Sequence, residues 1–222
     1  MVQFSPDMLN RFGAPELSLL TECGAMELPT FPDYLSSAIW NHIRGVNHPD
    51  EAVLHLDLAF LRRAVAAADE YNLARVDLLR FVEGLTSGRH LLDAYLSSLR
   101  HFEQCIGSIW QAAELFNRMT HRVQGLDLKK MTLYKQGDNS DLERINKLNN
   151  VAKHFNAEQA EQTAAPVWIT NVGLKSADAS LSFDELYENV VALFEAARQT
   201  FEEIPNEAIA RKAANGSSGA PG

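Results

Sequence analysis

The sequence predicts an all-α protein, an up-down helical bundle of about five helices with a small β-hairpin before the last helix. Three observations predict it: apolar residues recur at helical spacing over long stretches, two capping boxes mark helix starts, and glycine and proline cluster between these stretches. The chain has 222 residues and is 46% hydrophobic and 22% charged, which is ordinary for a globular protein. We expect an irregular N-terminal segment (1–32), a single helical-bundle domain (33–205) and a flexible tail (206–222).

Glycines and prolines punctuate the N-terminal segment, so no long regular element is expected there. The first helix is predicted over Tyr34–Arg44, and the Asn47–Asp50 stretch interrupts the chain after it. Acidic residues at positions 50 and 51 favour a new helix start, because the helix dipole stabilises negative charge there.

The second predicted helix has an apolar face that weakens in its middle. The face falters at Asn72 and Arg75, which predicts either a kink near Asn72 or two helices in tandem. The Thr86–Gly88 segment ends it. The residues of this face, before and after the interruption, are Leu54, Leu58, Leu61, Val65, Ala68, Val76, Leu79 and Val82.

The third predicted helix has the most regular pattern in the chain. Its apolar residues alternate at spacings of three and four over about thirty residues, or roughly 45 Å of helix. Such a stripe has to be covered by another helix, which predicts antiparallel neighbours in a bundle. A coiled-coil homodimer would use the same pattern. The stripe consists of Leu92, Tyr95, Leu99, Phe102, Ile106, Ile109, Ala113 and Phe116, widened by Leu96 and Trp110.

The C-terminal third carries two helix start signals and one strand signal. A connector over 121–139 leads to the capping box Ser140–Glu143, and the helix continues to Phe155. The β-branched stretch Val167–Asn171 predicts a strand that pairs with residues 180–183. A second capping box, Ser182–Glu185, is flanked by leucines in the positions of a hydrophobic staple. It opens the last helix, which Pro205 is expected to end.

Charge and cysteine content narrow the function classes. A net charge of −9 argues against a general nucleic-acid coat, although residues 118–153 are locally basic. That cluster is either a solvated connector or an anion-facing patch. The two isolated cysteines and the absence of a secretory leader predict a reduced, cytoplasmic protein. No apolar run approaches the roughly 18 residues of a membrane span, so no membrane partner is expected.

Motifs for the common enzyme classes are absent. The sequence has no glycine-rich phosphate loop, no GxSxG elbow and no HExxH helix. The pairs His55/Asp57 and His101/Glu103 are two residues apart, which points their side chains in different directions on a helix. The helices also lack the carboxylate and histidine pairs of di-metal bundles. We therefore predict no cofactor and no metal.

One segment, Leu148–Phe155 (LNNVAKHF), stands out as a candidate site. Helical spacing places Glu143, Lys147, Asn150 and His154 on one polar stripe, opposite the apolar face. A histidine beside a lysine and an asparagine could bind a phosphate, or act as a general acid or base in RNA cleavage. The alternative interpretation is a solvated helix face.

LNNVAKHF resembles the motif of the HEPN superfamily (higher eukaryotes and prokaryotes nucleotide-binding domains), in which an arginine, usually followed by a polar residue, precedes a histidine. Aligning His154 with that histidine puts Asn150 at the polar position and Asn149 at the arginine position; Arg144 lies outside the family spacing. The segment 166–186 and the last helix also resemble the C-terminal part of uncharacterised bacterial proteins of this type. The resemblance implies a helical bundle, commonly dimeric, related to metal-independent ribonucleases of toxin and defence systems. Asparagine has no guanidinium to stabilise a phosphorane, so the motif is degenerate.

The sequence thus favours a HEPN-like protein that associates with RNA or a nucleotide, as a homodimer, with binding favoured over efficient cleavage. The alternative is a non-enzymatic helical module that acts by homodimerisation or partner binding. The predicted catalytic residues are His154 and Asn150. The predicted nucleic-acid-binding residues are Lys147, Lys153, Arg144, Arg118 and Arg122.

Overall fold

The computed structural model of the protein describes residues 6–12, 14–43, 50–87, 91–154 and 166–216. It confirms a mostly helical fold with a small antiparallel sheet before the last helix. The elements are α1 (Pro6–Phe12), η1 (Leu17–Leu19), α2 (Tyr34–Ile43), α3 (Glu51–Thr86), α4 (Leu92–Val123), η2 (Leu128–Lys130), α5 (Asp141–Lys153), β1 (Trp168–Ile169), β2 (Gly173–Lys175), β3 (Ser180–Ser182) and α7 (Phe183–Gly216).

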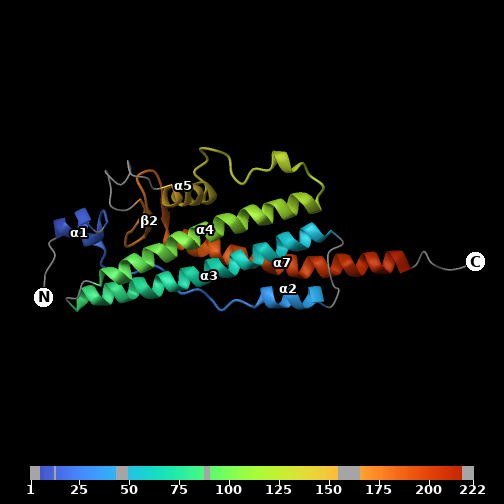
Figure 1. The fold of residues 1–222 in the computed structure, drawn as a ribbon, viewed down its shortest axis with the longest axis horizontal. Coiled ribbons are helices and arrows are strands. Elements are labelled where there is room, and N and C mark those ends of the chain that lie inside the picture. The colour runs from blue at the N-terminus through green and yellow to red at the C-terminus, as the bar shows by residue number, and fades with distance from the viewer. Residues whose placement is uncertain (1–5, 13, 44–49, 88–90, 155–165, 217–222) are drawn as a thin grey trace, which may run out of the picture.

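The long helices α3 and α4 form an antiparallel hairpin, and α7 runs along it (Figure 1). Ion pairs join the two helices of the hairpin near both ends: Arg80 with Asp93 at 3.5 Å, and Arg122 with Asp50 at 2.6 Å. Aromatic contacts fill the space between the three helices. The ring of Phe102 lies 6.1 Å from that of Tyr71 and 5.3 Å from that of Phe183. The core therefore runs along the length of the bundle.

The helix α3 is continuous through Asn72, so the predicted alternative of two tandem helices is wrong. The predicted face is buried at Leu54, Leu61 and Ala68, but Val76 is exposed, and the second half of the helix buries Ala74, Leu78 and Phe81 instead. The buried alanines let α3 approach its neighbours closely, but their small apolar surface marks a buried face only weakly in the sequence. The acid at position 57 also faces inward and is buried.

The predicted stripe of α4 is confirmed over most of its length. Tyr95, Phe102, Ile106 and Ile109 are almost completely buried, in contact with α3, α5 and α7. Leu96, which was expected to widen the stripe, is 57% exposed. The face that could have formed a coiled-coil dimer is therefore covered within the chain.

Residues 14–33, here called the N-terminal strap, lie against the bundle and contribute buried side chains to its core. The ring of Phe31 stacks on Phe194 of α7 at 3.7 Å, with an interplanar angle of 7°. Tyr71 Oη donates to the carbonyl of Met26, and Arg75 Nε donates to that of Ala25, each at 3.0 Å. As predicted, this part of the chain has no long regular element, yet it packs as part of the bundle.

The sheet has three strands in the order β1-β2-β3 rather than the predicted hairpin of two. β1 pairs with β2, and β2 pairs with β3, both antiparallel, so the predicted direct pairing of β1 with β3 is wrong. The central strand opens at Gly173, where a Cβ would lie only 2.1 Å from the carbonyl oxygen of Leu181. Glycine thus allows the close contact between β2 and β3.

Both capping boxes cap helices, but only one is reciprocal. In the second, the Glu185 N–H donates to Ser182 Oγ, and Glu185 Oε2 accepts from the Ser182 N–H. In the first, Ser140 Oγ accepts from the Glu143 N–H, whereas the Glu143 carboxylate turns to two amides of the connector.

The helix α7 continues through Pro205 to Gly216, so the prediction that this proline ends it is wrong. Proline removes one backbone hydrogen bond, but glutamate, alanine, arginine and lysine dominate the flanking sequence and favour helix on both sides. Part of the predicted tail (206–222) is therefore helical, and its last residues lie outside the described part. Among the helices described, none is long and apolar enough to span a membrane. Cys23 and Cys105 are both free thiols.

Candidate anion-binding site

The helix α5 carries Leu148–Lys153 of the LNNVAKHF segment, with His154 at its C-cap, while Phe155, to which the helix was predicted to continue, lies outside the described residues. The helix packs against α4 (Figure 1), and its residues Ile145 and Leu148 are fully buried. Its first turn is attached to the preceding connector by Glu143. The two carboxylate oxygens of that residue accept the N–H groups of Gly137 at 2.9 Å and Asn139 at 2.6 Å. These hydrogen bonds, together with Lys147 at 3.3 Å, lower the pKa of the Glu143 carboxyl. The orientation of α5 is therefore fixed from both its apolar face and its N-terminus.

The two predicted catalytic residues lie on the solvent side of α5. Asn150 is exposed, and its Nδ2 donates to Asn146 Oδ1 at 3.2 Å. Asn146 in turn donates to Tyr134 Oη at 2.7 Å. His154 is exposed at the C-cap, where its backbone N–H donates to the carbonyl of Asn150. Both side chains are accessible to a ligand.

The predicted basic residues divide into paired and accessible ones. The Arg144 guanidinium bonds Asp141 at 2.6 Å and Glu185 at 2.7 Å, which ties α5 to α7. Arg122, on α4, bonds the acid at the start of α3. Arg118 and Lys153 are exposed. The predicted set therefore does not form one patch, because its members lie on two helices and several already serve ion pairs.

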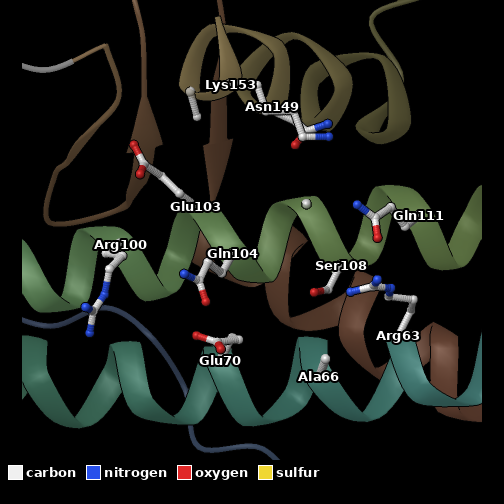
Figure 2. A pocket seen from close by; sticks show the side chains of 12 residues that line it. Arg63, Ala66, Glu70, Arg100, Glu103, Gln104, Ser108, Gln111, Asn149 and Lys153 are labelled. Carbon is white, nitrogen blue, oxygen red and sulfur yellow. The ribbon is translucent and has the colours of Figure 1, made fainter. Parts of the chain in front are cut away.

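A pocket of about 440 Å³ lies between α3, α4 and α5 (Figure 2). α4 runs along its middle, with α3 on one side and α5 on the other. Of the predicted site residues, only Lys153 reaches it, together with its neighbour in the motif, Asn149. The lining residues are Arg63, Ala66, Glu70, Arg100, Glu103, Gln104, Gly107, Ser108, Gln111, Asn149, Ala152 and Lys153.

Part of the pocket lies at the contact between α4 and α5. Asn149, which the resemblance to the HEPN motif aligns with an arginine, is only 3% exposed. A Cβ on Gly107 of α4 would lie 3.3 Å from Asn149 Oδ1, tighter than most such contacts. A glycine at this point therefore allows α5 to lie close enough to α4 to bring Lys153 to the pocket.

The cationic lining comes from three helices: Arg63 from α3, Arg100 from α4 and Lys153 from α5 (Figure 2). All three side chains are exposed at the pocket surface. Guanidinium groups hydrogen-bond phosphate and carboxylate oxygens in a bidentate manner, and an ammonium adds a point charge. Figure 2 shows Arg63 and Arg100 at opposite ends of the pocket, so each guanidinium can meet a separate anionic group.

Two carboxylates line the same pocket in different environments. Glu70 Oε2 lies 2.6 Å from Nδ1 of His101, whose Nε2 lies 4.0 Å from Asp77. Glu103 is half-buried, and burial raises the pKa of its carboxyl to about 7. The charge of the pocket therefore changes with pH around neutrality.

The sequence predictions missed the contributions of α3 and α4 to this pocket. The signal was present, because Arg100, Gln104 and Gln111 lie off the apolar stripe of α4 and share one helix side at spacings of four and seven. Nothing in the sequence, however, aligned that side with Arg63, which lies on another helix.

Comparison of the chain with models of protein families, with curated proteins and with solved structures finds no match. Within the part of the chain that the structure describes, no group of three or more His, Cys, Asp or Glu side chains is arranged to hold a metal ion. The side chains of the pocket themselves indicate its ligand. The cations suit an anion, and the amides suit hydrogen bonds to the groups that the anion carries.

Proposed function

We propose that this protein is a HEPN-like helical protein that associates with RNA or a nucleotide through the pocket between α3, α4 and α5. One observation carries the proposal: the helix with the family-like motif contributes Asn149 and Lys153 to a pocket in which Arg63 and Arg100 supply guanidinium groups. The guanidinium that the motif lacks is thus available from two other helices.

The pocket chemistry supports a nucleotide unit as the ligand. A volume of about 440 Å³ is in the range of small-molecule sites. Gln104 and Gln111 each offer a donor and an acceptor, which suits hydrogen bonds to base edges or ribose hydroxyls. The cations suit the phosphate. We propose that three residues on the outer side of α5 contact the RNA strand where it leaves the pocket: His154, Asn150 and Lys147.

Binding is proposed over efficient cleavage. Asn149 cannot supply a cation to a phosphorane, and it is buried against α4. His154 does not line the pocket, so the motif histidine and the guanidinium groups do not meet at one point of the described surface. The motif is therefore proposed to be degenerate as a ribonuclease.

The test is binding and cleavage of end-labelled single-stranded RNA without metal, with wild type, Arg63→Ala and Arg62→Ala. Arg62 is an exposed neighbour on the same helix that does not line the pocket, so it controls for general charge. We expect Arg63→Ala to weaken binding about five- to tenfold, and Arg62→Ala by less than about twofold. Equal losses in both variants would mean non-specific attraction, and no binding by wild type would refute the proposal.

His154→Ala separates the role of the motif from that of the pocket. If RNA is cleaved by wild type and cleavage is lost in this variant, the motif is an active ribonuclease and the assignment of a degenerate role is wrong. Binding without cleavage by both proteins agrees with the proposal.

A second candidate function is a helical interaction module, favoured by a cluster of exposed apolar side chains on α2. Ile39, Trp40 and Ile43 are 39%, 59% and 65% exposed, and they lie within about one helical turn. Exposed apolar clusters mark interaction surfaces, here proposed for a second copy of the chain. Sedimentation equilibrium of wild type and Trp40→Ser at micromolar concentration tests it. A dimer that dissociates in the variant supports this candidate, and a wild-type monomer refutes it.

A further inference from the structure

The His101 ring of α4 joins an acid on α3 to one of the cations of the pocket. Its Nδ1 lies 2.6 Å from Glu70 Oε2, and its Nε2 lies 3.4 Å from Nη2 of Arg100. Glu70 and Arg100 both line the pocket, whereas His101 does not. The side chains of His101 and Glu70 are only 15% and 22% exposed, so the pair is held between the two helices.

These two contacts assign the ring proton of His101. A carboxylate can only accept a hydrogen bond, so the ring nitrogen beside Glu70 is the donor, Nδ1–H. A guanidinium can only donate, so the nitrogen beside Arg100 is the acceptor, an unprotonated Nε2. The remaining acid near the ring is Asp77, whose Oδ2 lies 4.0 Å from Nε2, beyond hydrogen-bonding distance. The contacts are therefore those of a neutral imidazole with its proton on Nδ1.

We propose that His101 is a positioning residue, which orients the Arg100 guanidinium towards an RNA phosphate while Glu70 holds the His101 ring. The inference rests on the proposed function and adds to it a residue that does not touch the ligand. A guanidinium has five N–H donors in one plane. The hydrogen bond to His101 fixes the direction of that plane and leaves the other donors of Arg100 for the phosphate.

The same arrangement preserves the positive charge of Arg100. Figure 2 shows the Arg100 side chain extending from α4 towards α3, the helix that carries Glu70. A direct ion pair with Glu70 would cancel the charge, but the Glu70 carboxylate bonds His101 instead. Among the described residues no acid forms an ion pair with Arg100, whereas Arg122 and Arg144 are each bound by acids. A neutral ring thus orients the guanidinium without neutralising it.

The experiment is a double-mutant cycle, measured as affinity of the full chain for end-labelled single-stranded RNA at about pH 8, where an ordinary histidine is neutral. His101→Leu removes both ring nitrogens, and His101→Gln keeps an amide that can donate to Glu70 and accept from Arg100. Each is made in wild type and in Arg100→Ala. His55→Leu is the control, because His55 is an exposed histidine that does not line the pocket.

We expect His101→Leu to weaken RNA binding about three- to tenfold in the wild-type background and less than about 1.5-fold in Arg100→Ala. His101→Gln and His55→Leu should stay within about twofold of wild type. A loss of equal size in both backgrounds overturns the inference, because His101 would then act without Arg100. It is also overturned if His101→Gln loses as much affinity as His101→Leu.

NMR of the histidine ring nitrogens tests the hydrogen bonds in the free protein, without RNA. The signals that disappear in His101→Gln belong to His101, and they should show a protonated Nδ1 and an unprotonated Nε2. A proton on Nε2 would overturn the inference alone, even if the pocket binds RNA. Failure of wild type to bind RNA would overturn the proposed function together with the inference, so the two failures are distinguishable.

Discussion

The side-chain oxygen of Asn149 lies so close to Gly107 that a Cβ on the glycine would approach it to 3.3 Å. This contact joins the motif helix α5 to the middle of α4. Asn149, which the resemblance to the HEPN motif aligns with an arginine, is therefore a short, buried side chain. The space for a longer one is taken by α4.

Asn149→Arg tests this account of the contact. We expect the variant to lose about 1–3 kcal/mol of unfolding free energy, because extra atoms in a packed contact displace their neighbours. Asn150→Arg, at the exposed neighbouring position, should change it by less than about 0.5 kcal/mol. Urea denaturation of both variants provides the measurement. Equal stability of the two would show that the α4–α5 contact can open for a long side chain.

The salt dependence of RNA binding should report the role of Arg63. Each phosphate neutralised on a single strand contributes about 0.7 to the slope of log affinity against log salt concentration. Arg63→Ala is expected to lower the slope by roughly this amount, while Arg62→Ala leaves it nearly unchanged. Filter binding at several salt concentrations measures both slopes. An identical reduction in the two variants would contradict a specific phosphate contact.

Asp57→Asn should alter how stability depends on pH. Burial in α3 raises the pKa of Asp57 to about 6, although a hydrogen bond with Thr200 opposes the shift. Because the folded pKa exceeds the unfolded value, the folded state holds the proton more tightly, and stability falls as pH rises from about 4 through about 6. For wild type the fall amounts to about 2–3 kcal/mol, and the variant should lack it.

The comparison for Asp57→Asn requires urea unfolding at about pH 4.5 and pH 7.5, on either side of the shifted pKa. Asp69→Asn, at an exposed acid of the same helix, is the matched control and should follow wild type. A pH dependence in Asp57→Asn as steep as that of wild type would assign the effect to another group.

Arg144→Ala should loosen the joint between α5 and α7. Burial alone would raise the pKa of Glu185, but hydrogen bonds from Ser182 and Arg144 outweigh it and lower the pKa. Stability from this carboxylate is therefore present above the ordinary glutamate pKa and is lost as pH falls through the lower folded value. We expect the variant to lose about 1–2 kcal/mol at pH 7 and less in acid.

Thermal unfolding of wild type and Arg144→Ala between about pH 3 and pH 7 measures the difference in stability between them, which is expected to shrink in acid. Arg198→Ala is a suitable control, because Arg198 and its partner Glu195 form an exposed pair within α7. Exposed ion pairs of this kind contribute little to the free energy of unfolding. If the stability lost in Arg144→Ala stays constant down to the lowest pH, the lost interaction is not the one with Glu185.

Asn171→Ala should release one end of the N-terminal strap. Its Oδ1 accepts the backbone N–H groups of Thr21 at 2.8 Å and Glu22 at 3.2 Å, and its Nδ2 donates to the carbonyl of Leu19. Hydrogen exchange at the Thr21 and Glu22 amides should accelerate by about tenfold, because local opening costs less free energy once these hydrogen bonds are gone. Val172→Ala, at a 72% exposed neighbour, should leave them unchanged. Unchanged exchange in Asn171→Ala would show that other contacts hold the strap.

The parts of the fold predicted correctly were those in which large apolar side chains repeat in a regular way. The stripe of α4 from Tyr95 to Ile109 and the start of α7 at Ser182 are examples. In α3 the second half of the face was predicted incorrectly, because Val76 is exposed and Ala74, Leu78 and Phe81 are buried instead. The strand β2 has only three residues and opens on a glycine, which leaves no alternation to detect.

The candidate site could be predicted only where its residues share one helix. Lys153 and Asn149 belong to the motif, and both reach the pocket. Arg63 and Gln111 lie at the same end of it (Figure 2), although they are far apart in the chain. Only the antiparallel register of α3 and α4 brings them together. That register depends on the packing of both buried faces, and the second half of the α3 face was predicted incorrectly.

The order of synthesis determines when the N-terminal strap can pack against the bundle. Its residues are synthesised well before Asn171 and Phe194, which bind it in the finished protein. The α3–α4 hairpin has its partners close in sequence and can form while translation continues. Until α7 is made, the core that buries Leu20 and Leu28 in the finished protein is incomplete. During this interval the strap is the stretch that a chaperone would find exposed.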